Sequence, residues 1–143
     1  MKRDEARKLV RSLLRPTGDL GYLVTRGPQW PPASECREYK KAVGRVIAHA
    51  YSLLLPVFDE HPELVPAPES ANGLGAAGEP PPETSPGGLV PYLDEAHAVI
   101  QDVVNRMLAD ASLARHKDFI HDSARQLEDA IDRARKMFMK AAR

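Results

Sequence analysis

Histidine and carboxylate residues recur at helical spacing in the C-terminal half of the chain, and these residue types bind metal ions. Asp94 stands three residues before His97, and His121 and Asp122 are adjacent further along. Residues three apart lie near each other on one side of a helix, as metal ligands in helical bundles do. The four residues are therefore candidate ligands of a metal-dependent hydrolase.

The adjacent pair His121 and Asp122 also resembles the motif after which the HD phosphohydrolases are named, which are helical metal enzymes. The resemblance covers this pair and His97 upstream, and it implies a later aspartate, for which Asp129 and Asp132 are candidates. A helical wheel, however, places both histidines about 75° to 100° from the centre of the apolar stripe. We therefore favour solvated or hydrogen-bonded histidines and no cofactor, with the hydrolase as the alternative.

Basic residues surround the apolar stripe at the start of the chain. Six of them lie within the first fifteen residues, against two acidic ones: Lys2, Arg3, Arg7, Lys8, Arg11 and Arg15. Such a helix either exposes a solvated basic face or contacts an acidic protein, a nucleic acid or a membrane. The absence of aromatic residues here and the zero net charge of the chain argue against nucleic acid.

We therefore predict a non-enzymatic helical protein-interaction module whose partner is another protein or a second copy, giving a homo-oligomer. Neither nucleic acid nor membrane is expected as a partner. The sequence names no partner and no catalytic set. The predicted partner-binding residues are Arg3, Arg7, Arg11 and Arg15.

Length and composition indicate one domain over residues 1–143. Cys36 is the single cysteine, which excludes an internal disulfide and every cysteine-rich zinc site. The N-terminal segment lacks the apolar run of a signal peptide, and no stretch approaches the roughly 20 apolar residues of a membrane span. We therefore expect a cytoplasmic protein.

Hydrophobic spacing predicts four helices. The first is short, over residues 3–15, because Pro16 and Gly18 follow it. The second begins near Ser34 and ends by His61, with a kink or break at Pro56. Residues 89–143 form a helical hairpin with its turn within 110–117, although the last helix has an alternative start at Asp122 or Ser123.

The predicted fold class is all-α: an antiparallel helical bundle of three long helices and one short N-terminal helix. Residues 62–88 hold seven prolines, five glycines and four glutamates without a basic residue, which predicts a long disordered, flexible acidic loop. The first and last helices are net basic and the third is net acidic. We therefore expect the third helix to lie between the other two.

Overall fold

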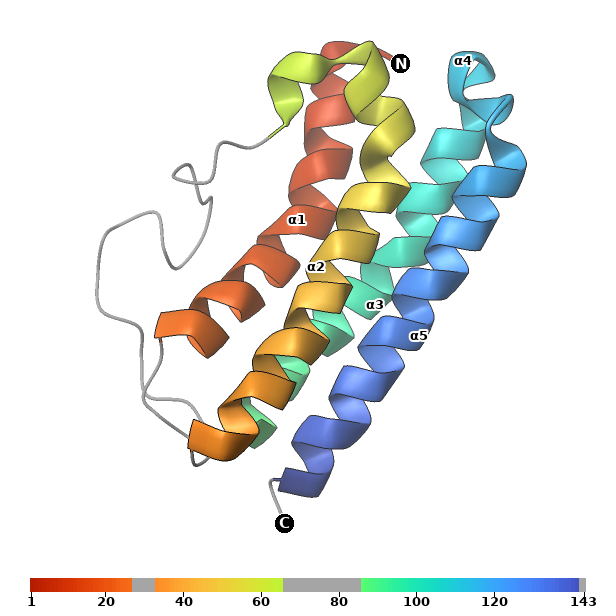
Figure 1. Ribbon diagram of the computed structural model, residues 1–143. Helices are drawn as coiled ribbons and strands as arrows, with labels where there is room; N and C mark the ends of the chain where they lie inside the picture. The colour runs from red at the N-terminus through yellow and green to blue at the C-terminus, as the bar shows by residue number, and fades with distance from the viewer. Residues whose placement is uncertain (27–32, 66–85, 142–143) are drawn as a thin grey trace.

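The computed structural model describes residues 1–26, 33–65 and 86–141, and over these residues the chain is helical and has no strand (Figure 1). The predicted all-α class is confirmed for this part of the chain. The helices, in order, are α1 (Arg3–Arg26), α2 (Ala33–Glu60), the short 3-10 helix η1 (Pro62–Leu64), α3 (Pro86–Ala109), α4 (Ala111–Ala114) and α5 (Lys117–Ala141).

The four long helices pack side by side. Helix α1 contacts α2 and α3, and α5 contacts the same two helices. Figure 1 shows α1 and α5 running in one direction while α2 and α3 run in the other, so every pair of contacting long helices is antiparallel. Helices α1 and α5 therefore occupy opposite corners of the packed group.

Each helix buries the apolar stripe that its sequence predicts. The described core contains aliphatic side chains from all four long helices, and the rings of Tyr39 and Phe138 stack with centroids 5.4 Å apart where α2 begins and α5 ends. Only two polar side chains are buried in the described part of the chain, Thr17 and Ser123. The core is thus formed by hydrophobic packing, and none of the charged side chains that the structure describes is buried in it.

The prediction of a short first helix over residues 3–15 is wrong, because α1 continues through Pro16 to Arg26. Pro16 and Thr17 are buried, and the Thr17 hydroxyl donates to the Leu13 carbonyl at 3.1 Å. Beyond them Leu20 and Leu23 are buried, each stabilising the fold by about 1.5 to 3 kcal/mol. Together they offset the roughly 3 kcal/mol that an interior proline costs a helix. Residues 1–26, 33–65 and 86–141 therefore contain four long helices.

Helix α2 continues through Pro56 without the predicted break, and it ends at Glu60, in agreement with the predicted end by His61. Two other boundaries differ from the sequence-based expectation. Helix α5 begins at Lys117, so the alternative start at Asp122 or Ser123 is wrong, and Ser123 is buried inside the helix. The prediction of a loop over 62–88 is wrong at both ends, because η1 and the first turn of α3 fall within that range. The rest of that predicted loop, residues 66–85, lies outside the described residues.

The predicted turn within residues 110–117 is confirmed. Asp110 has an extended backbone and caps α4, because its carboxylate accepts a hydrogen bond from the Ser112 amide at 3.0 Å. Two turn residues then lead into α5, which packs back against α3. This cap marks a turn that lacks both glycine and proline.

The predicted position of the acidic third helix is also confirmed, since α3 contacts both α1 and α5. Among the described residues one ion pair joins α3 to α5, between Asp94 and Arg135 at 2.9 Å. Both side chains are about half exposed, so the pair is worth at most about 1 kcal/mol. Hydrophobic burial, rather than this pair, holds α3 in place.

Candidate binding surface on helix α1

The basic residues predicted to bind a partner lie on the outer side of α1. Arg7, Arg11 and Arg15 are exposed, whereas Ala6, Leu9, Val10 and Leu13 on the opposite side are buried. A spacing of four residues places successive arginines on adjacent turns, about 6 Å apart along the helix axis. Lys8 is also exposed and adds a fourth positive charge. We call Arg7, Lys8, Arg11 and Arg15 the α1 basic face.

None of the α1 basic face residues makes an ion pair or hydrogen bond within the described parts of the chain. Like charges four residues apart on a helix repel by about 0.2 to 0.5 kcal/mol per pair. The arginine row therefore costs stability and gains no compensating contact within the described chain. A partner that carries negative charge would remove this repulsion.

Arg3, the fourth predicted partner-binding residue, differs from the others. Its Nε lies 3.6 Å from the Glu63 carboxylate of η1, and its side chain is 60% exposed. This pair lies between the start of α1 and η1, and η1 contacts both α1 and α2. Arg3 is therefore at the edge of the α1 basic face and is partly neutralised.

A second row of basic residues, which the sequence reasoning missed, lies on α2. Arg37, Lys41 and Arg45 are also four residues apart, and each is exposed without an ion pair in the described parts of the chain. The sequence pattern that could have predicted this row is the four-residue spacing of basic residues, which is also found in α1. Because α1 and α2 are antiparallel, the two rows lie at opposite ends of this helix pair (Figure 1).

The end of the molecule where α1 begins holds a polar cluster. The Met1 ammonium lies 3.0 Å from the Asp110 carboxylate and 3.4 Å from that of Glu60. The Ser112 hydroxyl contacts both carboxylates and can donate its one hydrogen to either. The imidazole Nε2 of His61 lies 2.7 Å from the Met1 carbonyl oxygen. These contacts join the start of α1 to the end of α2 and to the turn before α5.

The cluster shifts the acidity of two of its groups. Hydrogen bonds from Ser112 and then from the Met1 ammonium lower the pKa of Asp110 to about 2. The hydrogen bond to Asp110 is the main reason why the pKa of the Met1 ammonium is raised. The polar groups of this cluster serve as hydrogen-bond donors and acceptors for one another, which indicates a structural role at this end of the fold.

The four candidate metal ligands do not gather in one place. Asp94 and His97 lie on α3, His121 and Asp122 lie on α5, and all four are exposed. Asp94 is paired with Arg135, while Asp122 accepts hydrogen bonds from Arg125 and Gln126 at 3.0 Å.

Over residues 1–26, 33–65 and 86–141, no group of three or more histidine, cysteine, aspartate or glutamate side chains is arranged to hold a metal ion. The side chain of Cys36 lies outside the described side chains.

Comparison with known proteins adds no functional assignment. Neither a protein-family model, nor a curated protein, nor a solved structure matches this chain. Across the described helices, none combines the length and apolar character required to cross a membrane. Inference about function therefore depends on the surface itself.

Proposed function

We propose that this chain is a non-enzymatic protein-interaction module of the cytoplasm, and that an acidic protein surface docks on the α1 basic face. The observation that carries the proposal is the row Arg7, Arg11 and Arg15, which is exposed and unpaired among the described residues. A row that repels itself and serves no contact of the fold is explained by a partner outside the fold.

The α1 row supports this proposal more strongly than the α2 row because of the charges around it. Between Ala6 and Gly18 there are four basic residues and no acidic one. The α2 row contains one acidic residue, Glu38, so residues 37–45 have a net charge of +3 against +4 for residues 7–15. A carboxylate between two successive arginines of α1 would interact with both.

A protein partner suits the dimensions of this surface. Arg15 is eight residues after Arg7, so the row extends over about 12 Å of helix, and it lies on one rigid element. Carboxylates at every fourth position of a second helix have the same spacing. The zero net charge of the chain gives no long-range attraction to nucleic acid or to an anionic membrane.

The test uses a fluorescent synthetic peptide, a helix with a glutamate at every fourth position, and measures its binding by anisotropy. The charge-reversed variant Arg7→Glu/Arg11→Glu/Arg15→Glu is compared with the matched control Arg37→Glu/Lys41→Glu/Arg45→Glu. Both change the net charge equally, and both alter exposed residues. We expect at least a tenfold loss of affinity for the α1 variant and less than a twofold loss for the control.

Equal losses in the two variants would show a response to net charge and overturn the proposal. A larger loss in the control would move the site to α2. A DNA duplex and vesicles with anionic lipid serve as competitors in the same assay. Displacement of the peptide by either one at lower concentration than by unlabelled peptide would assign the surface to that ligand and overturn the protein-binding proposal.

A further inference from the structure

Two basic segments of the chain meet at the end of the molecule where α2 begins and α5 ends. Residues 37–45 of α2 hold four basic side chains and one acidic one, and residues 133–140 of α5 hold four basic side chains and no acidic one. The stacked rings of Tyr39 and Phe138 place the two segments side by side on antiparallel helices (Figure 1). Their combined net charge is +7, in a chain whose net charge is zero.

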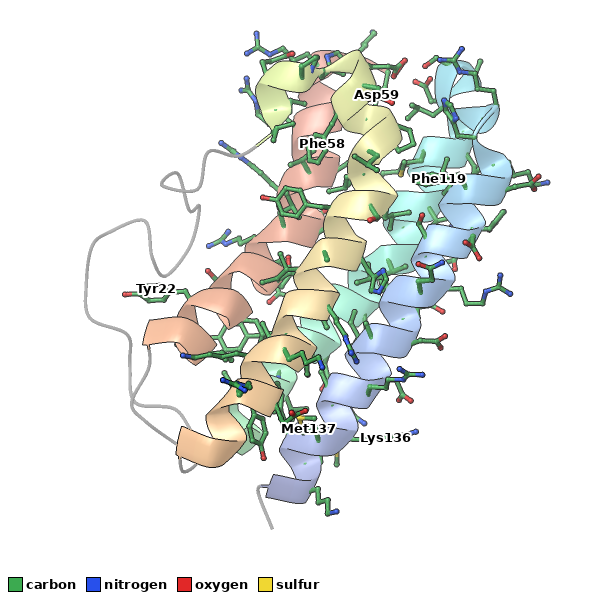
Figure 2. All side chains as sticks on the ribbon, viewed as in Figure 1. Tyr22, Phe58, Asp59, Phe119, Lys136 and Met137 are labelled. Atoms are coloured by element: carbon green, nitrogen blue, oxygen red, sulfur yellow. The ribbon has the colours of Figure 1, made fainter. Side chains whose placement is uncertain are left out.

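Most of these cations are not neutralised within the described parts of the chain. Arg135 pairs with Asp94 of α3 at 2.9 Å, and Lys136, labelled in Figure 2, pairs with Asp132 at 3.0 Å. The exposed Asp129 lies one turn before the α5 segment. With these three carboxylates counted, the net charge is still +4. Six basic side chains are exposed and make no ion pair or hydrogen bond with a described residue: Arg37, Lys40, Lys41, Arg45, Arg133 and Lys140.

Contacts of neighbouring residues show on which side of each helix these cations lie. Ile47 of α2 faces α1, because its Cδ1 atom would lie 2.8 Å from a Cβ atom added to Gly21. Arg45 precedes Ile47 by two residues, about 200° around the helix, so it lies on the side away from α1. On α5, Arg133 likewise precedes Arg135, which pairs with α3, by two residues, so it lies on the side away from α3. Both arginines are therefore on the face that α2 and α5 form together.

The two arginines also lie at the same height along the helices. Arg45 comes six residues after Tyr39 and Arg133 comes five residues before Phe138, which is about 9 Å and 8 Å along antiparallel helices whose rings stack. One lysine on each helix shares the side of its arginine, one turn before Arg45 and two turns after Arg133. We call Lys41, Arg45, Arg133 and Lys140 the α2–α5 basic face.

The surroundings of the α2–α5 basic face favour a nucleic acid over a protein. Met139 is the exposed large apolar side chain of the two segments, and it follows Arg135 by one turn, so it lies on the side of α5 nearer to α3. The centre of a protein interface is apolar, whereas arginine and lysine alone can contact a phosphodiester backbone. The α1 basic face differs, because Leu55 is 47% exposed on the side of α2 nearer to α1.

We propose that the α2–α5 basic face binds the phosphodiester backbone of a nucleic acid without reading its sequence. Seven residues, about 10 Å of helix, separate Arg133 from Lys140, which corresponds to about three phosphates of one strand. The expectation of no nucleic-acid partner was based on the net charge of the chain. Net charge does not describe a surface on which the packing of α2 against α5 gathers cations from two distant segments.

This inference goes beyond the proposed function, because it assigns a second ligand to a second surface. Helices α1 and α5 occupy opposite corners of the fold, so a nucleic acid on the α2–α5 basic face leaves the α1 basic face free (Figure 1). One molecule would then hold an acidic protein and a nucleic acid at the same time.

The experiment measures binding of the full chain to a short fluorescent DNA duplex, and to an RNA duplex of the same sequence, by anisotropy over a salt series. Four phosphate contacts predict that the logarithm of the association constant falls with the logarithm of the salt concentration with a slope of about −4. The variants Lys41→Gln/Arg45→Gln and Arg133→Gln/Lys140→Gln should each bind at least tenfold more weakly at about 0.1 M salt and flatten the slope by about 2.

The matched control is Arg7→Gln/Arg11→Gln, which removes the same charge from two exposed residues of α1. We expect it to bind the duplex within twofold of the unaltered chain and to lose affinity for the glutamate peptide. The two variants of the α2–α5 basic face should show the reverse, and their retained peptide binding shows that they are folded. The duplex that binds more tightly identifies DNA or RNA as the source of the backbone.

Other outcomes overturn the inference in distinguishable ways. A chain that binds the glutamate peptide and neither duplex refutes the inference and leaves the proposed function intact, whereas duplex binding without peptide binding refutes the proposed function alone. Equal losses in all three variants would show a response to net charge. Displacement of the duplex by polyglutamate as readily as by unlabelled DNA would assign the face to acidic proteins and refute the nucleic-acid assignment.

Discussion

The substitution Arg11→Glu is predicted to stabilise the fold while weakening partner binding. Arg11 has three basic neighbours at helical contact spacing, Arg7, Lys8 and Arg15, and none of the four has a partner in the described parts of the chain. Reversal of its charge converts three repulsive pairs into attractive ones. Each conversion removes a repulsion and adds an attraction of about 0.2 to 0.5 kcal/mol, so the three together raise the free energy of unfolding by about 1 to 3 kcal/mol.

Other contributions to this change are small. Arginine and glutamate have similar helix propensities, and the Arg11 side chain is exposed, so neither intrinsic preference nor lost packing offsets the gain. Arg11→Gln removes the repulsion without adding attraction and should give about half the effect. Lys41→Glu on α2 gains two attractive pairs but adds repulsion with Glu38, so its gain should be about 0.5 kcal/mol.

Urea unfolding followed by circular dichroism measures these differences, and the slope of unfolding free energy against urea should be unchanged. Peptide binding by the same three variants separates stability from function. Arg11→Glu should bind more weakly although it is more stable, whereas Lys41→Glu should bind normally. A fall in the free energy of unfolding for Arg11→Glu would refute the reasoning, because it would show that Arg11 makes a stabilising contact.

Further predictions concern the fold. Leu20→Ala should cost about 2 to 5 kcal/mol in urea unfolding because Leu20 is buried, whereas a cost below about 0.5 kcal/mol would show that α1 does not pack beyond Pro16. Gly18→Ala should stabilise by about 0.5 to 1 kcal/mol, since nothing lies within 4 Å of the added carbon. The same change at Gly21 meets the Ile47 Cδ1 atom at 2.8 Å and should gain less; equal gains would contradict the close packing of α1 on α2.

The pKa of the Asp110 carboxyl is about 2 in the folded chain, against an ordinary value of 3.8, so the ionised carboxylate stabilises the fold. This stabilisation is fully present above pH 3.8 and is lost as the pH falls through 2. Asp110→Asn should therefore lower the free energy of unfolding by about 1 to 2 kcal/mol at neutral pH and flatten its acid dependence, measured by unfolding at several pH values. An unchanged acid dependence would contradict this prediction.

Hydrophobic spacing was sufficient to predict the long helices because each one buries a single stripe. The turn near Asp110 was predicted from chain length, because one helix over residues 89–143 would be too long for a compact domain. The end of α1 was mispredicted because Pro16 and Gly18 are local signals. The burial of Leu20 and Leu23, which outweighs them, depends on helices that pack against α1.

The candidate surface was partly predictable for a related reason. Side-chain spacing on one helix shows which residues share a face, so Arg7, Arg11 and Arg15 could be grouped from sequence. Spacing does not show which charges find partners on other helices. Asp94, a candidate metal ligand by spacing, instead pairs with Arg135 of α5.

The most direct test of the central claim maps the glutamate peptide onto the chain by backbone amide chemical shifts. The unaltered chain is the suitable protein, because its α1 basic face is intact. The amides whose shifts change on titration should cluster between Ala6 and Gly18 of α1. Changes centred on residues 37–45 of α2, or spread over α3 and α5, would contradict the assignment of the binding surface to α1.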